Sequence, residues 1–353
     1  MLCPVREPHH RHHRTSGPHP LTAQPATPGP PRIPPTNPCS PRIRRNLSCL
    51  LSCPAPPLTG RVAVVSGASS GMGAATAERL AELGATAVVL ARRKDKLQDV
   101  VHRIEAAGGT ALALPVDVTD RAAVQTVAHQ VADRFGHADL VFNNAGVQLI
   151  SGIEELKVDD WQRQIDLNIT GLMNVIAGFL PHLTDSAQQG KPADLINTSS
   201  IAATRILEKF SVYSGTKAYI SHLTRLLRVE LGPKMVRVAT IEPGMVDTEL
   251  PDHVTDPDAS RLMADLIHDI DCLQSTDIAE TVAFMAALPR HVNLTQITIM
   301  PTAQAICGAA VHHGSPTGMR VPDRRTSPRT NEPRSPGPEL SGQREVHFRH
   351  LLR

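Results

Sequence analysis

The chain has 353 residues, with 36 Lys and Arg, 34 Asp and Glu, and a formal net charge of +2. Residues 1–57 hold 15 of the 30 prolines and a charge of about +6, and residues 305–353 hold 6 more prolines and about +4. The middle therefore carries about −8 and only one of the six cysteines, Cys272, which excludes a disulfide framework and gives no sign of a basic nucleic-acid-binding face.

Both ends of the chain, residues 1–57 and 305–353, are rich in Pro, Arg, His and Ser and poor in aromatic residues. Such segments cannot bury enough apolar surface to offset the entropy of folding, so we predict that they are disordered. One interpretation is a pair of nucleic-acid-binding or SH3-type tails; the favoured alternative is an overlong start and a read-through end of the gene, or plain disorder. The apolar run at 47–53 is too short and too close to prolines to favour a signal peptide.

No stretch reaches the ~18 apolar residues that a membrane span needs. No Cys/His cluster has the spacing of a metal site. We therefore predict a cytoplasmic protein with no metal, no membrane partner and no nucleic-acid partner.

Between residues 58 and 304, short β-branched runs alternate with longer amphipathic runs. In chain order we expect strands at 62–66, 86–91, 111–115, 139–143, 195–199, 236–241 and 296–300. We expect helices at 72–83, 94–107, 122–135, 161–183, 213–231, 260–270 and 277–288. This alternation predicts one α/β domain of the Rossmann type, with a doubly wound, parallel, seven-stranded sheet and helices on both faces.

A glycine-rich turn, Ser66-Gly67-Ala-Ser-Ser-Gly71-Met-Gly73, follows the first expected strand. Glycines allow a tight turn and let a pyrophosphate approach the free N–H groups at the start of the next helix. A purely structural turn could use the same glycines. The position after the first strand of an alternating chain favours a dinucleotide site.

The second expected strand ends in Ala91-Arg92-Arg93-Lys94, with no acidic residue before Asp95. An acidic residue there would bond the ribose 2′-hydroxyl of the cofactor and repel a 2′-phosphate. Guanidinium groups bind phosphate well. We infer NADP(H), with Arg92 as the first phosphate ligand and Arg93 as the second. The alternative is a solvated basic helix start, which the helix dipole disfavours.

Tyr213 and Lys217 are four residues apart on an expected helix and so share one face. A nearby ammonium favours the phenolate, so we expect the pKa of Tyr213 to fall from its usual value near 10 towards neutrality. Such a tyrosine can act as a general acid or base. Ser200, at the end of the fifth strand, can hydrogen-bond a developing oxyanion. Taken alone, the pair could equally be a packing tyrosine and a surface lysine.

Together, these segments resemble the short-chain dehydrogenase/reductase family over residues 58–304. The resemblance also rests on Asp117-Val118, on Asn143-Asn144-Ala145-Gly146, on Asn168, and on Pro243-Gly244 with Thr248. It implies a catalytic tetrad of Asn168, Ser200, Tyr213 and Lys217. The cofactor contacts that it implies are Gly67, Ser69, Ser70, Gly71, Met72, Gly73, Arg92, Arg93, Asp117, Val118, Asn144, Ala145, Gly146, Tyr213, Lys217, Pro243, Gly244, Val246 and Thr248.

The resemblance also implies roles for individual residues. The three loop glycines would cradle the pyrophosphate, and Asn144 would steady the central strands. Asn168 would hold a water that passes protons to Lys217, and Lys217 would bond the nicotinamide ribose. Tyr213 would transfer the proton while hydride moves to or from the nicotinamide.

Within the family, the segments 90–93 and 291–304 resemble an NADP-dependent branch that acts on 3-hydroxy acids, serine and small aldehydes, including clavaldehyde-type reductases. We therefore predict an NADP(H)-dependent oxidoreductase that interconverts a small alcohol or hydroxy acid with its carbonyl, as a homo-oligomer (tetramer or dimer). The alternative is a non-catalytic NADP(H)-sensing protein on the same fold. The polar segment 247–271 is expected to close over the substrate, with Glu249, His253 and Arg205 as candidate contacts.

Overall fold

A computed structural model describes residues 58–249, 256, 258, 260, 261 and 270–304 of the protein. The expected disordered ends, most of the expected helix at 260–270 and much of the segment 247–271 lie outside these residues. The predicted domain boundaries at 57/58 and 304/305 stay predictions.

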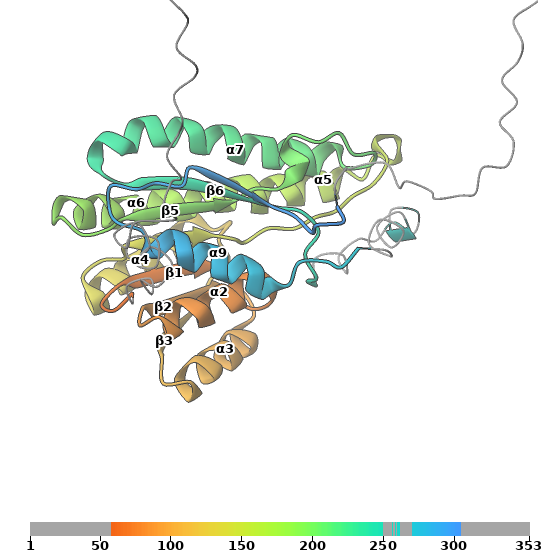
Figure 1. Ribbon diagram of the computed structural model, residues 1–353. Helices are drawn as coiled ribbons and strands as arrows, with labels where there is room; N and C mark the ends of the chain where they lie inside the picture. The colour runs from red at the N-terminus through yellow and green to blue at the C-terminus, as the bar shows by residue number, and fades with distance from the viewer. Residues whose placement is uncertain (1–57, 250–255, 257, 259, 262–269, 305–353) are drawn as a thin grey trace, which may run out of the picture. The chain divides into compact units, whose positions relative to one another are not determined.

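Seven parallel strands form one sheet in the order β3-β2-β1-β4-β5-β6-β7 (Figure 1). The strands are β1 (Val62–Ser66), β2 (Thr86–Ala91), β3 (Thr110–Pro115), β4 (Leu140–Asn143), β5 (Asp194–Thr198), β6 (Arg237–Pro243) and β7 (Gln296–Ile299). The strand order reverses between β1 and β4, and a parallel sheet gathers the carboxyl ends of its strands along one edge, where ligands bind in such folds. The predicted fold class is confirmed.

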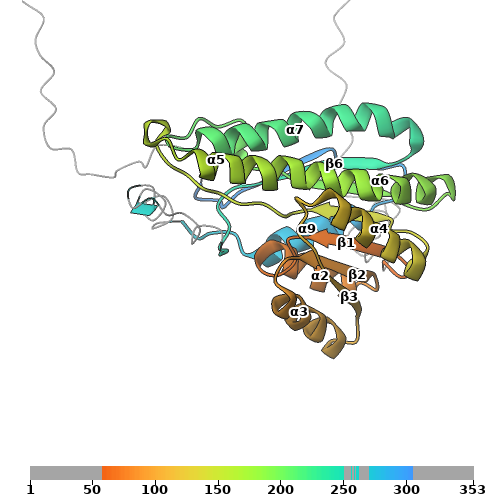
Figure 2. The same cartoon turned by 180° about the vertical axis from the view of Figure 1, so that it is seen from behind.

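Helices cover both faces of this sheet (Figures 1 and 2). One face carries α2 (Gly71–Glu82), α3 (Lys94–Ala106) and α9 (Ser275–Ala287). The other face carries α4 (Arg121–Phe135), α6 (Leu172–Gln188) and α7 (Ser211–Leu231). The shorter elements are the helix α5 (Val158–Ile165), the π-helical turn η2 (Asp166–Gly171) and three 3₁₀ turns, η1 (Ile153–Glu155), η3 (Ile201–Ala203) and η4 (Gly232–Lys234).

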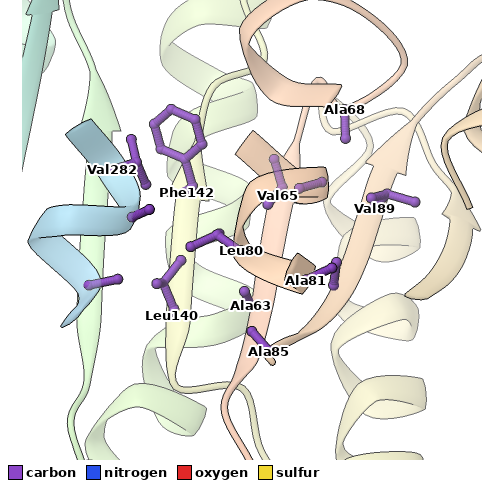
Figure 3. Close-up of a cluster of buried hydrophobic side chains, with 14 of the residues drawn as sticks. Ala63, Val65, Ala68, Leu80, Ala81, Ala85, Val89, Leu140, Phe142 and Val282 are labelled. Atoms are coloured by element: carbon purple, nitrogen blue, oxygen red, sulfur yellow. The ribbon is translucent and has the colours of Figure 1, made fainter. Parts of the chain in front are cut away.

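Two apolar clusters hold the layers together, one on each side of the sheet. Side chains of strand β1 alternate between them, as the pleat requires. Ala63 and Val65 belong to the cluster under α2, α3 and α9, which Figure 3 shows. Val62 and Val64 belong to the cluster under α4, α6 and α7.

The long helix expected at 161–183 is interrupted, so that prediction was wrong in one respect. A π-helical turn, η2, separates α5 from α6. Such turns concentrate at functional sites, and this one carries Asn168, which is 1% exposed. The sequence prediction assumed one regular helical period through this segment and so missed the wider turn.

A buried ion cluster ties the amino ends of the four central strands together. Arg61 donates to Asp139 (2.6 Å) and to Asp194 (2.7 Å). Arg237 donates to both carboxylate oxygens of Asp194, at 2.6 and 2.7 Å. Both guanidiniums also donate to the carbonyl of Ala286 on α9. These bonds fix the strand starts at the edge opposite the carboxyl ends.

Candidate active site

A pocket of about 260 Å³ lies at the carboxyl edge of the sheet, between the loops that follow β1, β2, β3, β4 and β6. Most of the predicted cofactor residues line it: Gly67, Ser69, Ser70, Gly71, Met72, Arg92, Arg93, Asp117, Val118, Asn144, Ala145, Gly146 and Thr248. Ala91, Val116, Leu167 and Glu249 also line the pocket and were not predicted as cofactor contacts.

Two glycines of the loop after β1 adopt left-handed backbone conformations, with φ of +66° at Gly67 and +52° at Gly71. A Cβ at Gly67 would lie 2.8 Å from the Cα of Ala145, so only glycine fits there. Gly73 is not among the residues that line the pocket, and its predicted contact with the pyrophosphate stays a prediction. A Cβ at Gly73 would collide with the carbonyl of Gly67, so its role is to let α2 start close behind the loop.

Hydrogen bonds join the loops after β1 and β4. The hydroxyl of Ser66 accepts from the backbone N–H groups of Asn144 (3.1 Å) and Ala145 (3.2 Å). The side-chain amide of Asn144 donates to the carbonyl of Gly67 at 3.4 Å. The Oδ1 atom of Asn144 is buried without a partner, so it can still accept a hydrogen bond inside the pocket.

The two arginines after β2 have different surroundings. Arg93 donates to the hydroxyls of Ser69 and Ser70, at 2.9 Å each, and pairs with Glu249 at 3.3 Å. Among the described residues, Arg92 forms no hydrogen bond or ion pair, although its charge contributes to lowering the pKa of Asp117. Arg92 is therefore the guanidinium with free donors for an anionic ligand.

Asp117 is held as a carboxylate. Burial opposes its ionisation, but hydrogen bonds from the N–H and hydroxyl of Thr119, together with the charge of Arg92, keep its pKa below the usual value. The carboxylate thereby shapes the turn after β3.

Tyr213 and Lys217 lie side by side on α7 and are 7% and 6% exposed. Tyr213 shares a hydrogen bond with Ser200, which follows β5. The Lys217 ammonium donates to the carbonyl of Thr198 (3.0 Å) and lies 5.6 Å from the centre of the Tyr213 ring. The fold thus brings Ser200, Tyr213 and Lys217 together at the end of β5.

The pKa of Tyr213 moves in the direction opposite to the one expected from the sequence. Burial raises it to about 12, and the hydrogen bond with Ser200 only partly offsets this. Burial also lowers the pKa of Lys217 to about 8. The sequence argument weighed the neighbouring charge and not the desolvation of both groups.

Asn168 on η2 is joined to the same site. Its Oδ1 accepts from the N–H of Val147 (2.8 Å), and its amide donates to the Val147 carbonyl (2.9 Å) and to the hydroxyl of Thr216 (3.1 Å). A Cβ placed on Gly146, which lines the pocket, would lie 3.2 Å from Asn168 Oδ1 and 3.8 Å from Lys217 Nζ. The pocket and the lysine are therefore neighbours.

Hydrogen bonds from its own backbone N–H groups hold the loop after β6 in place. Met245 N–H donates to Gln304 Oε1 (2.9 Å), and Asp247 N–H donates to the Leu273 carbonyl (2.8 Å). Of the cofactor residues predicted here, Thr248 lines the pocket, whereas Pro243, Gly244 and Val246 do not. The contribution of Gln304 had no signal in the sequence, because it depends on where the chain returns after β7.

Two of the three candidate substrate contacts lie in the described part of the chain: Glu249 lines the pocket, and Arg205 is exposed. The third, His253, lies outside the described residues. Tyr213 packs in an apolar cluster with Ile150, Ala202 and Phe210.

The described part of the chain contains no group of three or more His, Cys, Asp or Glu side chains that could hold a metal ion. None of its helices is long and apolar enough to span a bilayer.

A family model described as short chain dehydrogenase matches residues 61–259. The chain belongs to the short-chain dehydrogenase family. This confirms the resemblance noted in the sequence. An uncharacterised oxidoreductase from Staphylococcus aureus (strain MRSA252) is 36% identical over 244 residues, which are 69% of this chain and 98% of that protein.

Solved structures of a dehydrogenase and of a reductase are similar to this chain. The closed form of serine dehydrogenase complexed with NADP+ has 28% identity and a TM-score of 0.64, over 71% of this chain and 99% of that one. A 3-ketoacyl-(acyl-carrier-protein) reductase from Brucella melitensis complexed with NADH has 27% identity and a TM-score of 0.62, over 69% of this chain and 98% of that one.

Proposed function

We propose that the protein is an NADP(H)-dependent oxidoreductase that interconverts a small alcohol or hydroxy acid with its carbonyl compound. The observation that carries this proposal is the buried pair of Tyr213 and Lys217, with Ser200 bonded to Tyr213, beside the pocket at the carboxyl edge of the sheet. Membership of the short-chain dehydrogenase family supports the reaction class.

The pocket residues fit a nicotinamide dinucleotide. The left-handed Gly67 and Gly71 leave room for a pyrophosphate at the start of α2, and the buried Oδ1 of Asn144 is free to accept a hydrogen bond. Val118 and Leu167 offer an apolar wall for an adenine. When bound, the nicotinamide supplies or accepts the hydride.

The protein's own groups would move the proton. In carbonyl reduction, the hydroxyls of Ser200 and Tyr213 hold the carbonyl oxygen of the substrate, and Tyr213 donates its proton as the oxygen gains negative charge. With a pKa of about 12 the phenol of Tyr213 is protonated at neutral pH, which is the form that can donate a proton. Lys217, with a pKa near 8, can return a proton to Tyr213 near neutral pH.

The preference for NADP(H) rests on Arg92, whose donors are free at the end of β2, and on the lack of an acidic residue there. Arg93 is a second cation, already bonded to Ser69 and Ser70. The resemblance of segments 90–93 and 291–304, together with the likeness to serine dehydrogenase, supports a small hydroxy acid or aldehyde as substrate.

Tyr213→Phe tests the catalytic proposal. NADPH oxidation is followed with a panel of small aldehydes and keto acids, and cofactor binding is measured by fluorescence. The variant should bind NADPH as the wild type does and lose roughly 10²–10⁴-fold in kcat. Tyr219→Phe, on an exposed part of α7, is the matched control and should keep full activity. Turnover retained in Tyr213→Phe would refute the role of Tyr213, and NADPH binding without any wild-type turnover would favour the nucleotide-sensing alternative.

Arg92→Asp tests the cofactor preference. Loss of a charged hydrogen bond to the 2′-phosphate should weaken NADPH binding by about 1.5–3 kcal/mol and leave NADH binding unchanged or improved. Lys191→Asp, an exposed charge reversal just before β5, at the opposite edge of the sheet, is the control. An unchanged ratio of the two dissociation constants would mean that another residue holds the phosphate.

We also propose that the protein self-associates through the outer side of α7. Leu226 and Val229 on this helix are 50% and 73% exposed. Exposed apolar side chains grouped on one helix are typical of an interface. Light scattering on wild type and on Leu226→Glu should show an oligomer and its dissociation, whereas a wild-type monomer would refute the proposal.

A further inference from the structure

A buried chain of oxygen atoms runs from strand β6 to the turn of α7 that carries Lys217. Glu242 Oε1 lies 2.9 Å from Ser221 Oγ. Ser221 Oγ lies 2.7 Å from Ser199 Oγ, which lies 2.9 Å from the carbonyl oxygen of Lys217. Glu242, Ser221 and Ser199 are 2%, 5% and 2% exposed. All three contacts therefore have to be satisfied within the protein.

The number of protons available for these contacts can be compared with the number of contacts. Each of the three short oxygen–oxygen contacts needs one proton between its atoms. The carbonyl of Lys217 has none, and each serine hydroxyl supplies one. Two hydroxyl protons cannot serve three contacts. The third proton must belong to Glu242, because its carboxyl is the remaining member of the chain.

Glu242 has hydrogen-bond donors around it but no counter-charge. Its Oε2 accepts from Gln296 Nε2 (2.9 Å) and from the hydroxyl of Thr298 (3.3 Å), bonds that the carbonyl oxygen of a neutral acid and a carboxylate can both accept. In the described part of the chain no cation pairs with it. On the adjacent α7, the Lys217 ammonium donates to a backbone carbonyl, and Arg225 lies 3.4 Å from the Gln296 amide oxygen. A buried carboxylate without a counter-charge is unfavourable.

We propose that Glu242 is held as a neutral carboxylic acid and acts as a positioning residue for Lys217. Glu242 donates to Ser221, Ser221 to Ser199, and Ser199 to the Lys217 carbonyl. The chain joins β6 and the end of β5 to one turn of α7, and it fixes the backbone from which the lysine reaches its partner on β5. The positioning role rests on the proposed function, whereas the protonation of Glu242 does not.

Infrared difference spectroscopy of wild type against Glu242→Gln tests the protonation directly and needs no activity. The substitution should remove one carbonyl stretching band of a protonated carboxylic acid at neutral pH. Removal of a carboxylate band instead would overturn the proposal.

Kinetics of two variants test the positioning. Gln at 242 can donate to Ser221 through its amide and accept from Gln296, whereas Leu has a similar size and does neither. Glu242→Gln should keep kcat close to that of the wild type. Glu242→Leu should lose roughly 10- to 100-fold in kcat, with KM for the carbonyl substrate unchanged, because the lysine is displaced rather than removed.

The outcomes separate the possibilities. Wild-type activity in both Glu242→Gln and Glu242→Leu would refute the positioning role. A similar loss of kcat in both would refute the proposal that Glu242 is protonated and donates to Ser221. If Glu242→Leu does not fold, Ser221→Ala breaks the chain at its middle and should show the same loss in kcat; full activity in it would overturn the proposal. A wild type without turnover on any carbonyl compound would refute the proposed function and leave the infrared result standing.

Discussion

The buried ammonium of Lys217 should destabilise the cofactor-free protein, and Lys217→Met measures by how much. Burial lowers the pKa of this lysine from 10.5 to about 8. One pKa unit corresponds to about 1.4 kcal/mol, so carrying the charge in the folded protein at neutral pH costs about 3 kcal/mol. Met fills similar space but leaves the carbonyl of Thr198 without its donor, at a cost of about 1–2 kcal/mol. We expect a net stabilisation of about 1–2 kcal/mol in the variant.

The sign of the pH dependence provides the second half of this test. Below a pH of about 8 both states of the wild type bind the proton, and the penalty is present in full. Between about 8 and 10.5 the folded state binds fewer protons than the unfolded chain, so the wild type gains stability as the pH rises. The advantage of the variant should therefore shrink over this range.

Urea unfolding near neutral pH and again at alkaline pH provides the assay, with equal slopes required for the comparison. Lys234→Met, at an exposed lysine, is the matched control and should show neither the stabilisation nor its pH dependence. A Lys217→Met midpoint below that of the wild type at neutral pH would refute the reasoning.

Three further outcomes are expected. Burial lowers the pKa of His182, whose Nδ1 accepts from the N–H of Ala138 (3.2 Å). The free energy of unfolding should therefore fall as the pH drops below about 6.5. In urea titrations, His182→Gln should weaken this pH dependence. Arg61→Met leaves two buried carboxylates short of a partner and should cost about 3–5 kcal/mol in the free energy of unfolding; a loss below about 1 kcal/mol would contradict the ion cluster's role. Glu249→Gln removes the ion pair of Arg93 and should tighten NADPH binding by at most about 1 kcal/mol, with the larger effects at low salt. Glu280→Gln is the control, because its ion pair with Arg79 does not line the pocket, and it should leave NADPH binding unchanged.

Local chemistry along the chain was enough to predict the fold class and most of the pocket. The glycine turn, the arginines after β2 and the polar residues after β3 and β4 all follow strands, and the carboxyl ends of parallel strands meet at one edge. Their positions in space therefore follow from their positions along the chain. The spacing of Tyr213 and Lys217 likewise depends only on the pitch of one helix.

Other features were decided by contacts between distant segments. The pKa of Tyr213 depends on how deeply α7 is buried, and the place of Gly73 depends on the carbonyl of Gly67 behind it. Glu249 lies at the cofactor pocket because the loop after β6 reaches the glycine turn. None of these contacts has a periodic pattern in the sequence.

The sequence by itself determined the order of strands and helices and the family, and it supplied the proposed reacting groups, because each of these depends on near neighbours in the chain. Only the tertiary structure decided the charges and hydrogen bonds around those groups, including the oxygen chain from Glu242 to the Lys217 carbonyl. Desolvation and proton sharing depend on what surrounds an atom in space, and those surroundings come from β5, β6, β7 and α7 at once.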